Sequence, residues 1–200
     1  MKHLLQINTS LFAGGGQSSK LSHAMVDSWR ASNPDGEVSI LDFAQESVPH
    51  LTAERVQAFL TPAEQRSETQ RGIVAYSDSL IGQLRKADVV VLGLPMYNFG
   101  IPSTLKAYFD HIARAGETFR YTSSGPEGLL RDKNVYVFAA RGGNYSGTPL
   151  DTQTAYVRDF FKFLGLDQVE FIYAEGLALD PARRDAALTK AFAQIETLAA

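Results

Sequence analysis

The sequence predicts an α/β protein with a doubly wound parallel sheet, because short apolar strands alternate with helical patterns along its 200 residues. The clearest strand is Val89–Leu94, a valine-rich apolar run that is too short for a buried helix and is typical of a central strand. Right-handed crossovers place helices on both faces of such a sheet. Two strand orders fit, 2-1-3-4-5 and a Rossmann order. The five predicted strands are 2–7, 37–41, 89–94, 134–140 and 169–174.

The first predicted helix spans about 18–31. It carries Leu21, Met25 and Trp29 four positions apart, so that they share one face. The sequence Asn-Pro-Asp-Gly at 33–36 is a strong turn signal, which separates this helix from the second strand.

A long helix is expected from Thr61 to about Lys86. Thr61 is the predicted N-cap, Pro62 occupies the first helical position, and Glu64 completes a capping box. The preceding segment, 43–61, reads as polar loop and weak helix.

Prolines mark both sides of the loop that follows the central strand. Pro95 ends the strand, because proline cannot donate to a sheet ladder, and Pro102 suits the first turn of the next helix. That helix is expected to end near Gly116. Two more helices are predicted, over about 150–164 and 182–198.

Residues 117–130 are an insertion without helical pattern. Thr118–Tyr121 alternates, and Ser-Ser-Gly-Pro at 123–126 indicates a turn, so we expect a small hairpin that lies over the carboxyl edge of the sheet. Without repeats or a linker, residues 1–200 are expected to form a single domain with this hairpin inserted.

Composition narrows the classes of partner. The formal net charge of -3 gives no reason to expect nucleic acid or an anionic membrane. The absence of cysteine excludes disulfides and thiolate sites, and the four histidines show no metal spacing. A chain with no signal peptide pattern and no apolar run of about 20 residues is expected to be cytoplasmic.

Hydroxyls and glycines follow the first strand at 8–20, just before a helix start. Helix N-termini attract phosphate through free N–H groups and the helix dipole. Ser18 could instead serve only as the helix N-cap. Residues 14–19 also fit a dinucleotide fingerprint, with Asp42 near the place of the ribose acid, but the glycines begin about six residues after the strand, whereas that fingerprint needs a tight turn.

Two other strands also lead into unusual loops. Aromatic residues and Asn98 follow the central strand, and paired glycines follow strand four at 142–143, where backbone N–H groups can approach a ligand. Each loop alone could be core filling or a flexible connection. In the order 2-1-3-4-5, however, the three loops line one cleft, which suits the phosphate, ring and pyrimidine edge of flavin mononucleotide (FMN).

The sequence resembles the FMN-dependent NADH azoreductases, flavodoxin-like enzymes that also reduce quinones. The resemblance covers nearly the whole chain. Its most specific part lies between 95 and 129. The matching stretches are Pro-Met-Tyr-Asn-Phe at 95–99, Ala-Arg-Ala-Gly at 113–116, Thr-Phe-Arg-Tyr-Thr at 118–122, Gly-Pro-Glu-Gly-Leu at 125–129 and Arg-Gly-Gly at 141–143.

The resemblance implies a phosphate site at the first loop, a ring and ribityl site at 95–99 and a polar ring edge at 140–143. The cofactor residues would be Ser10, Gly16, Gln17, Ser18, Pro95, Met96, Tyr97, Asn98, Phe99, Ala140, Arg141, Gly142 and Gly143. The substrate site would be walled by Phe99, Phe119, Tyr121, Tyr145 and Phe163. Gly16 and Ala140 stand where some members have serine, and Tyr145 where some have histidine.

The expected enzyme passes a hydride from NADH or NADPH through noncovalent FMN to a quinone or aromatic azo compound. The flavin carries the chemistry, so no side chain is expected to act as an acid–base catalyst. Donor and acceptor would use one ring face in turn, which gives ping-pong kinetics. A homodimer with sites at its interface is expected. The alternatives are a flavodoxin-type electron carrier and a Rossmann NAD dehydrogenase.

Overall fold

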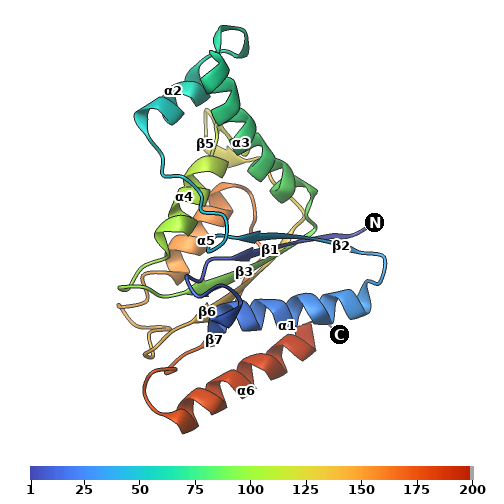
Figure 1. Cartoon of the computed structure of the whole chain (residues 1–200), viewed down its shortest axis with the longest axis vertical. Helices are drawn as coiled ribbons and strands as arrows, with labels where there is room; N and C mark the ends of the chain where they lie inside the picture. The colour runs from blue at the N-terminus through green and yellow to red at the C-terminus, as the bar shows by residue number, and fades with distance from the viewer. Residues whose placement is uncertain (199–200) are drawn as a thin grey trace.

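The computed structural model describes residues 1–198 and contains a five-stranded parallel sheet of order β2-β1-β3-β6-β7 (Figure 1). Without the two hairpin strands, this is the predicted order 2-1-3-4-5, and the Rossmann order is ruled out. The strands are β1 (His3–Asn8), β2 (Glu37–Asp42), β3 (Val89–Pro95), β6 (Asn134–Ala140) and β7 (Val169–Ala174).

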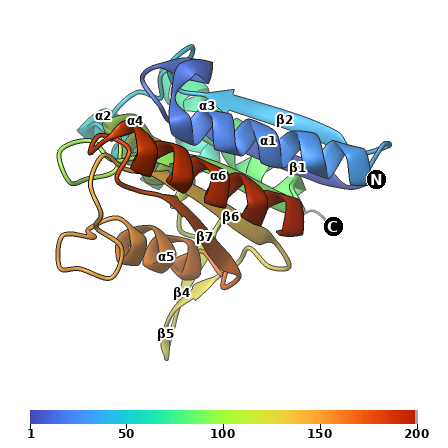
Figure 2. The same ribbon diagram turned by 90° about the horizontal axis from the view of Figure 1, so that it is seen from below.

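Helices cover both faces of the sheet, as predicted. Figures 1 and 2 show α1 and α6 side by side on one face, and α3, α4 and α5 on the other. Their bounds are α1 (Gln17–Ser32), α3 (Glu68–Lys86), α4 (Ser103–Ile112), α5 (Thr154–Phe163) and α6 (Pro181–Leu198).

The central strand β3 is buried on both sides. Val90 and Leu92 pack into the apolar layer beneath α3, α4 and α5, whereas Val91 packs into the layer beneath α1 and α6. This alternation explains why the sequence of β3 is apolar at nearly every position. The strand ends at Pro95, as expected.

The predicted start of the long helix at Thr61 is wrong. The helix α3 begins at Glu68, where Ser67 Oγ accepts the N–H of Gln70 at 3.2 Å and Gln70 Oε1 accepts the N–H of Ser67 at 3.0 Å. Thr61 instead ends the short helix α2 (Ala53–Leu60), since its backbone N–H and hydroxyl both donate to Gln57. The segment contains two capping signals, at Thr61 and at Ser67, and the long helix begins after the second.

The helix between β6 and β7, which was predicted to start near 150, begins at Thr154 in the structure as α5. Asp151 accepts the backbone N–H of Thr154 at 3.0 Å and its hydroxyl at 2.7 Å. Residues 141–153 therefore form a loop, which extends from the end of β6 to the start of α5.

The hairpin consists of β4 (Phe119–Thr122) and β5 (Gly125–Gly128), which pair antiparallel. Its predicted place over the carboxyl edge of the sheet is wrong. The Leu130 N–H donates to the Leu164 carbonyl at the end of α5 at 2.9 Å, and Glu117 pairs with Arg85 at the end of α3. Because α4 runs antiparallel to β3, the chain has returned to the amino edge before the hairpin begins (Figure 1).

Candidate functional site

Three loops leave the carboxyl ends of the adjacent strands β1, β3 and β6. We call them the first loop (9–16), the second loop (96–102) and the third loop (141–153). The Leu11 N–H donates to Tyr97 Oη at 3.1 Å, which joins the first and second loops. The rings of Phe99 and Tyr145 meet edge to face with centroids 5.8 Å apart, which joins the second and third. The three loops therefore form one rim at the sheet edge where ligands bind in this fold class.

The first loop holds a buried hydroxyl in front of α1. Ser10 Oγ accepts the Phe12 N–H at 3.2 Å, and Thr9 Oγ1 donates to the Gly93 carbonyl at 2.8 Å. A Cβ on Gly16 would lie 2.2 Å from Ser10 Oγ. The Ser10 hydroxyl thus occupies the space that a side chain at position 16 would need. This contact explains why glycine stands at position 16, where some azoreductases have serine.

The N-terminus of α1 suits an anion. Gly16 is the N-cap and supplies no side chain, and the first turn has no acidic residue. Ser18 is the second residue of the helix, so its interpretation as the N-cap is wrong. Its Oγ is buried and has no hydrogen-bond partner among residues 1–198. An orphaned hydroxyl beside free helical N–H groups and the positive end of the dipole fits a phosphate group.

The second loop turns tightly around two residues in the left-handed region. Asn98 has φ +50° and Phe99 has φ +63°, while Tyr97 and Gly100 exchange backbone hydrogen bonds of 3.2 and 2.9 Å. Non-glycine residues seldom adopt this conformation, and such strain is typical of functional sites. The turn leaves the Phe99 ring about half exposed on the rim.

The third loop presents glycine amides. The carbonyls of Gly142 and Gly143 accept N–H groups of Ala178 and Gly176, each at 3.0 Å, whereas the two glycine N–H groups have no partner within the described chain. A Cβ on Gly143 would lie 2.8 Å from the ring of Tyr145. The glycine carbonyls therefore hold the loop against residues 176–178, and the free glycine N–H groups can bind a ligand.

The side chain of Arg141 does not face the rim. It is fully buried and pairs with Asp151 at 2.9 Å and with Glu175 at 3.0 Å. Only its backbone remains available to a cofactor. Burial alone would raise the pKa of Asp151, but hydrogen bonds from Arg141 and Thr154 outweigh it and lower that pKa.

The sequence offered little sign of the residues that bind Arg141. Asp151 and Gln153 lie in an irregular loop, and Glu175 follows the last strand. One available signal is the arginine itself: an arginine that directly follows a buried strand, as Arg141 follows Ala140, requires acidic partners nearby.

The five predicted substrate residues fall into two groups within one chain. Phe99 and Tyr145 lie on the rim. The rings of Phe119 and Phe163 lie 4.4 Å apart, with Tyr121 5.4 Å from Phe119. This second group lies at the far end of α5, a helix of ten residues and thus about 15 Å long. One chain alone does not bring the two groups together.

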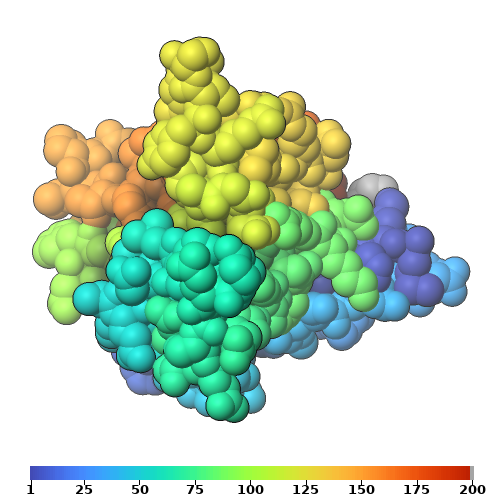
Figure 3. Space-filling view, turned by 90° about the horizontal axis from the view of Figure 1, so that it is seen from above, coloured from blue at the N-terminus to red at the C-terminus, as the bar shows by residue number. Residues whose placement is uncertain are grey.

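An open apolar groove of about 430 Å³ lies beside the second group. It runs between α2, the end of α4 and the hairpin, which stands out in yellow beside the cyan atoms of α2 in Figure 3. Leu60 and Tyr121 are about three quarters exposed there. The lining residues are Leu51, Val56, Phe59, Leu60, Arg66, Asp110, Ala113, Arg114, Ala115, Glu117, Phe119 and Tyr121.

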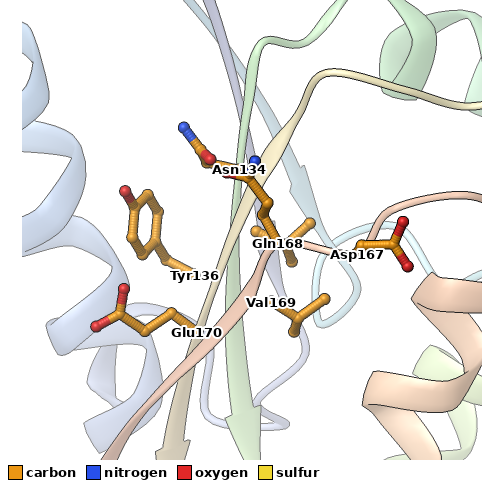
Figure 4. A pocket seen from close by; sticks show the side chains of 7 residues that line it. Asn134, Tyr136, Asp167, Gln168, Val169 and Glu170 are labelled. Atoms are coloured by element: carbon orange, nitrogen blue, oxygen red, sulfur yellow. The ribbon is translucent and has the colours of Figure 1, made fainter.

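A second groove, of about 390 Å³, lies between β6 and β7 (Figure 4). Its lining includes Asn134 at the start of β6, together with Asp167 and Gln168 just before β7. It therefore lies at the amino ends of these strands, opposite the rim, where parallel sheets do not place their ligand sites.

The residues behind other sequence interpretations have ordinary surroundings. The carboxylate of Asp42, the candidate ribose acid, accepts the Ala44 N–H at 3.0 Å and lies 3.3 Å from Gln45 Nε2. No group of three or more potential metal ligands occurs within residues 1–198. None of the helices in that range is long and apolar enough to span a membrane.

Comparison with known proteins adds sequence relatives. A family model described as the flavodoxin-like fold matches residues 2–199. An FMN-dependent NADH:quinone oxidoreductase of Cellvibrio japonicus is 58% identical over 196 residues, which cover 98% of each chain. FMN-dependent NADH:quinone oxidoreductase 6 of Burkholderia lata is 51% identical, with 96% of each chain covered.

Solved structures agree with these relatives. An azoreductase of Bacillus anthracis superimposes with a TM-score of 0.91 at 29% identity, covering 100% of this chain and 99% of the other. A B. anthracis FMN-dependent NADH-azoreductase in complex with FMN gives a TM-score of 0.89 at 27% identity, with 100% and 98% covered. The fold, the rim and these relatives together show that the chain belongs to the FMN-dependent NADH:quinone oxidoreductases, a family of enzymes with the flavodoxin-like fold.

Proposed function

We propose that this chain is an oxidoreductase that binds FMN noncovalently at the three-loop rim. When bound, FMN would accept a hydride from NADH or NADPH and reduce a quinone or an aromatic azo compound, the two substrates occupying its exposed face in turn. The observation that carries the proposal is the buried, unpartnered hydroxyl of Ser18 at the uncapped start of α1, on the same rim as the aromatic turn and the glycine amides.

Each loop would bind a different part of the cofactor. Ser10, Gly16, Gln17 and Ser18 would hold the phosphate through hydroxyls and the first N–H groups of α1. Residues 95–99 would hold the ring and the ribityl chain. The backbone of 140–143 would meet the polar edge of the ring, and the Gly142 and Gly143 N–H groups are free to do so. Since backbone donors dominate the first and third sites, the missing hydroxyls at 16 and 140 do not exclude the cofactor.

The protein would contribute binding, orientation and exclusion of water rather than an acid or base. The Phe99 ring would form one wall of the substrate site, and Tyr145 packs against its edge. The turn at 98–99 fixes the direction in which the Phe99 ring points, so a flat acceptor would meet a prepared surface.

A homodimer would complete the site. The rim exposes Phe99 near the start of α5, whereas the groove beyond the far end of that helix exposes Leu60 and Tyr121. Exposed apolar patches of this kind mark interaction surfaces, and a two-fold axis would let each rim meet the groove of the other chain. The substrate site would then be walled by Phe99 and Tyr145 of one chain and by Phe119, Tyr121 and Phe163 of the other.

The proposal predicts that purified protein is yellow and releases FMN on denaturation. It should oxidise NADH catalytically when a benzoquinone or an azo dye is supplied. A flavodoxin-type carrier would bind FMN without this turnover, and a Rossmann dehydrogenase would be colourless. Release of FAD, or failure to bind flavin after reconstitution, would contradict the proposal.

A further inference from the structure

The buried side chain of Gln153 connects the second loop to the third. It is fully buried, and its Nε2 donates to the carbonyls of Pro95 at 2.9 Å and Gly100 at 3.0 Å. These two carbonyls flank the aromatic turn on either side. The Oε1 atom accepts Arg141 Nε at 3.1 Å. One amide therefore ties both ends of the turn to the arginine that begins the third loop.

Arg141 carries this connection further into the third loop. Its Nη1 donates to Glu175 Oε1 at 3.0 Å, and that oxygen also accepts the N–H groups of Tyr145 at 3.0 Å and Ser146 at 2.9 Å. Nη2 donates to Asp151 at 2.9 Å. The guanidinium thus holds the start of the loop at 141, its middle at 145–146 and its end at 151.

The energetics of this network favour a single arrangement. A buried guanidinium with two carboxylates is costly to desolvate and is tolerated only when its donors are matched in geometry. Gln153 uses both donors and its acceptor within the network. Any shift of one loop against the other would leave a buried polar group unpaired.

We propose that Arg141 and Gln153 are positioning residues, which hold the second and third loops in register so that Phe99 and the Gly142 and Gly143 amides are presented together. This inference rests on the proposed function for its purpose, namely to shape the ring site. It does not require either side chain to touch the cofactor.

The central experiment compares Gln153→Met with the matched control Gln6→Met by hydrogen exchange of the cofactor-free protein. Gln6 is an equally buried glutamine, and its Nε2 donates to Ser22 at 3.0 Å beneath α1. In Gln153→Met, the hydrogen-bonded amides at 97 and 100 in the second loop and at 145 and 146 in the third should exchange about tenfold faster, because the three hydrogen bonds of Gln153 are lost. Gln6→Met should leave both segments unchanged. Faster exchange in only one segment, or in both variants equally, overturns the inference.

A binding experiment separates positioning from phosphate contact. Gln153→Met should raise the Kd of FMN and of riboflavin by the same factor, about tenfold, because both ligands share the ring. Arg141→Lys should also raise the Kd of both ligands, since lysine lacks the fork that reaches Gln153, Asp151 and Glu175. Unchanged Kd values for both ligands overturn the inference. A wild-type chain that couples its loops but binds no flavin refutes the proposed function and leaves the coupling standing.

Discussion

Gly128 of the hairpin crosses Gly165 so closely that a Cβ on Gly128 would lie 2.0 Å from the backbone nitrogen of Gly165. The next contact, from the Leu130 N–H to the Leu164 carbonyl, is a 2.9 Å hydrogen bond. The hairpin is therefore fixed to the end of α5 by backbone against backbone, and no side chain can be inserted there without moving one of the two segments.

Gly128→Ala should accordingly destabilise the fold by about 1–3 kcal/mol, the usual range for overpacking. The free energy of unfolding from urea titration measures this directly. Gly82→Ala is the control, because a Cβ there meets nothing within 4 Å and the residue lies inside α3. That change should stabilise the protein by up to about 1 kcal/mol. Equal effects of the two substitutions would contradict the close crossing.

Ser10→Ala and Ser18→Ala should each weaken FMN binding by roughly 1–3 kcal/mol, because each removes a hydrogen bond to a charged phosphate. Riboflavin has no phosphate, so its affinity should hardly change. Fluorescence titration with both ligands is sufficient. If the two ligands lose affinity equally, the serines support the fold and do not bind the phosphate.

Phe163→Ala should raise the Michaelis constant for quinone, because the proposed dimer places this side chain in the substrate site of the second copy. Its ring packs against Phe119, and both lie beside the apolar groove. Dilution of the wild-type protein should also lower its specific activity as the proposed dimer dissociates. Sedimentation velocity at assay concentration tests the link, and a fully active, FMN-loaded monomer would falsify it.

His111 should make the stability of the protein pH-dependent below neutrality. Burial lowers its pKa from the ordinary value of 6.5, although a hydrogen bond to the Ala107 carbonyl opposes the shift. The unfolded chain then takes up the proton at higher pH than the folded chain. The free energy of unfolding therefore keeps its full value above about pH 6.5 and declines as the pH falls from there through the lowered pKa of His111 in the folded protein.

Urea unfolding at a series of pH values from 7 to 5 tests this effect, and His111→Gln should flatten the dependence. Arg55, whose guanidinium lies 3.4 Å from His111 Nε2, comes from α2, so the same proton should loosen α2 against α4. An unaltered slope in the variant would show that other groups dominate the pH dependence.

The sequence predicted the parts of the fold that local pattern controls. The apolar run of β3 required cover on both faces, and the alternation of strands and helices gave a sheet whose first, third and fourth loops adjoin. The start of α3 was placed wrongly because Thr61 and Ser67 both begin plausible caps. Only the tertiary path decides that Thr61 closes the preceding helix.

Long-range geometry limited the prediction of the site. The position of the hairpin depends on where α4 returns the chain, which no local pattern records. Arg141 was recognised by its neighbours in sequence, but its side chain turns inward to Asp151 and Glu175. The family resemblance places Phe99 and Phe163 in one substrate site, but within one chain they lie near opposite ends of α5. A site that contains both would need a second copy of the chain, which a single sequence does not display.

The left-handed conformation of Phe99 lowers the stability of the folded protein while it keeps an aromatic ring on the rim. A bulky residue at φ +63° costs the folded state roughly 1–2 kcal/mol relative to glycine. Selection for thermal survival alone should therefore favour Phe99→Gly, and selection for turnover should restore the ring. A thermostabilised variant of this chain is best sought at other positions, because this turn is what leaves the Phe99 ring exposed on the rim, where the proposed substrate would meet it.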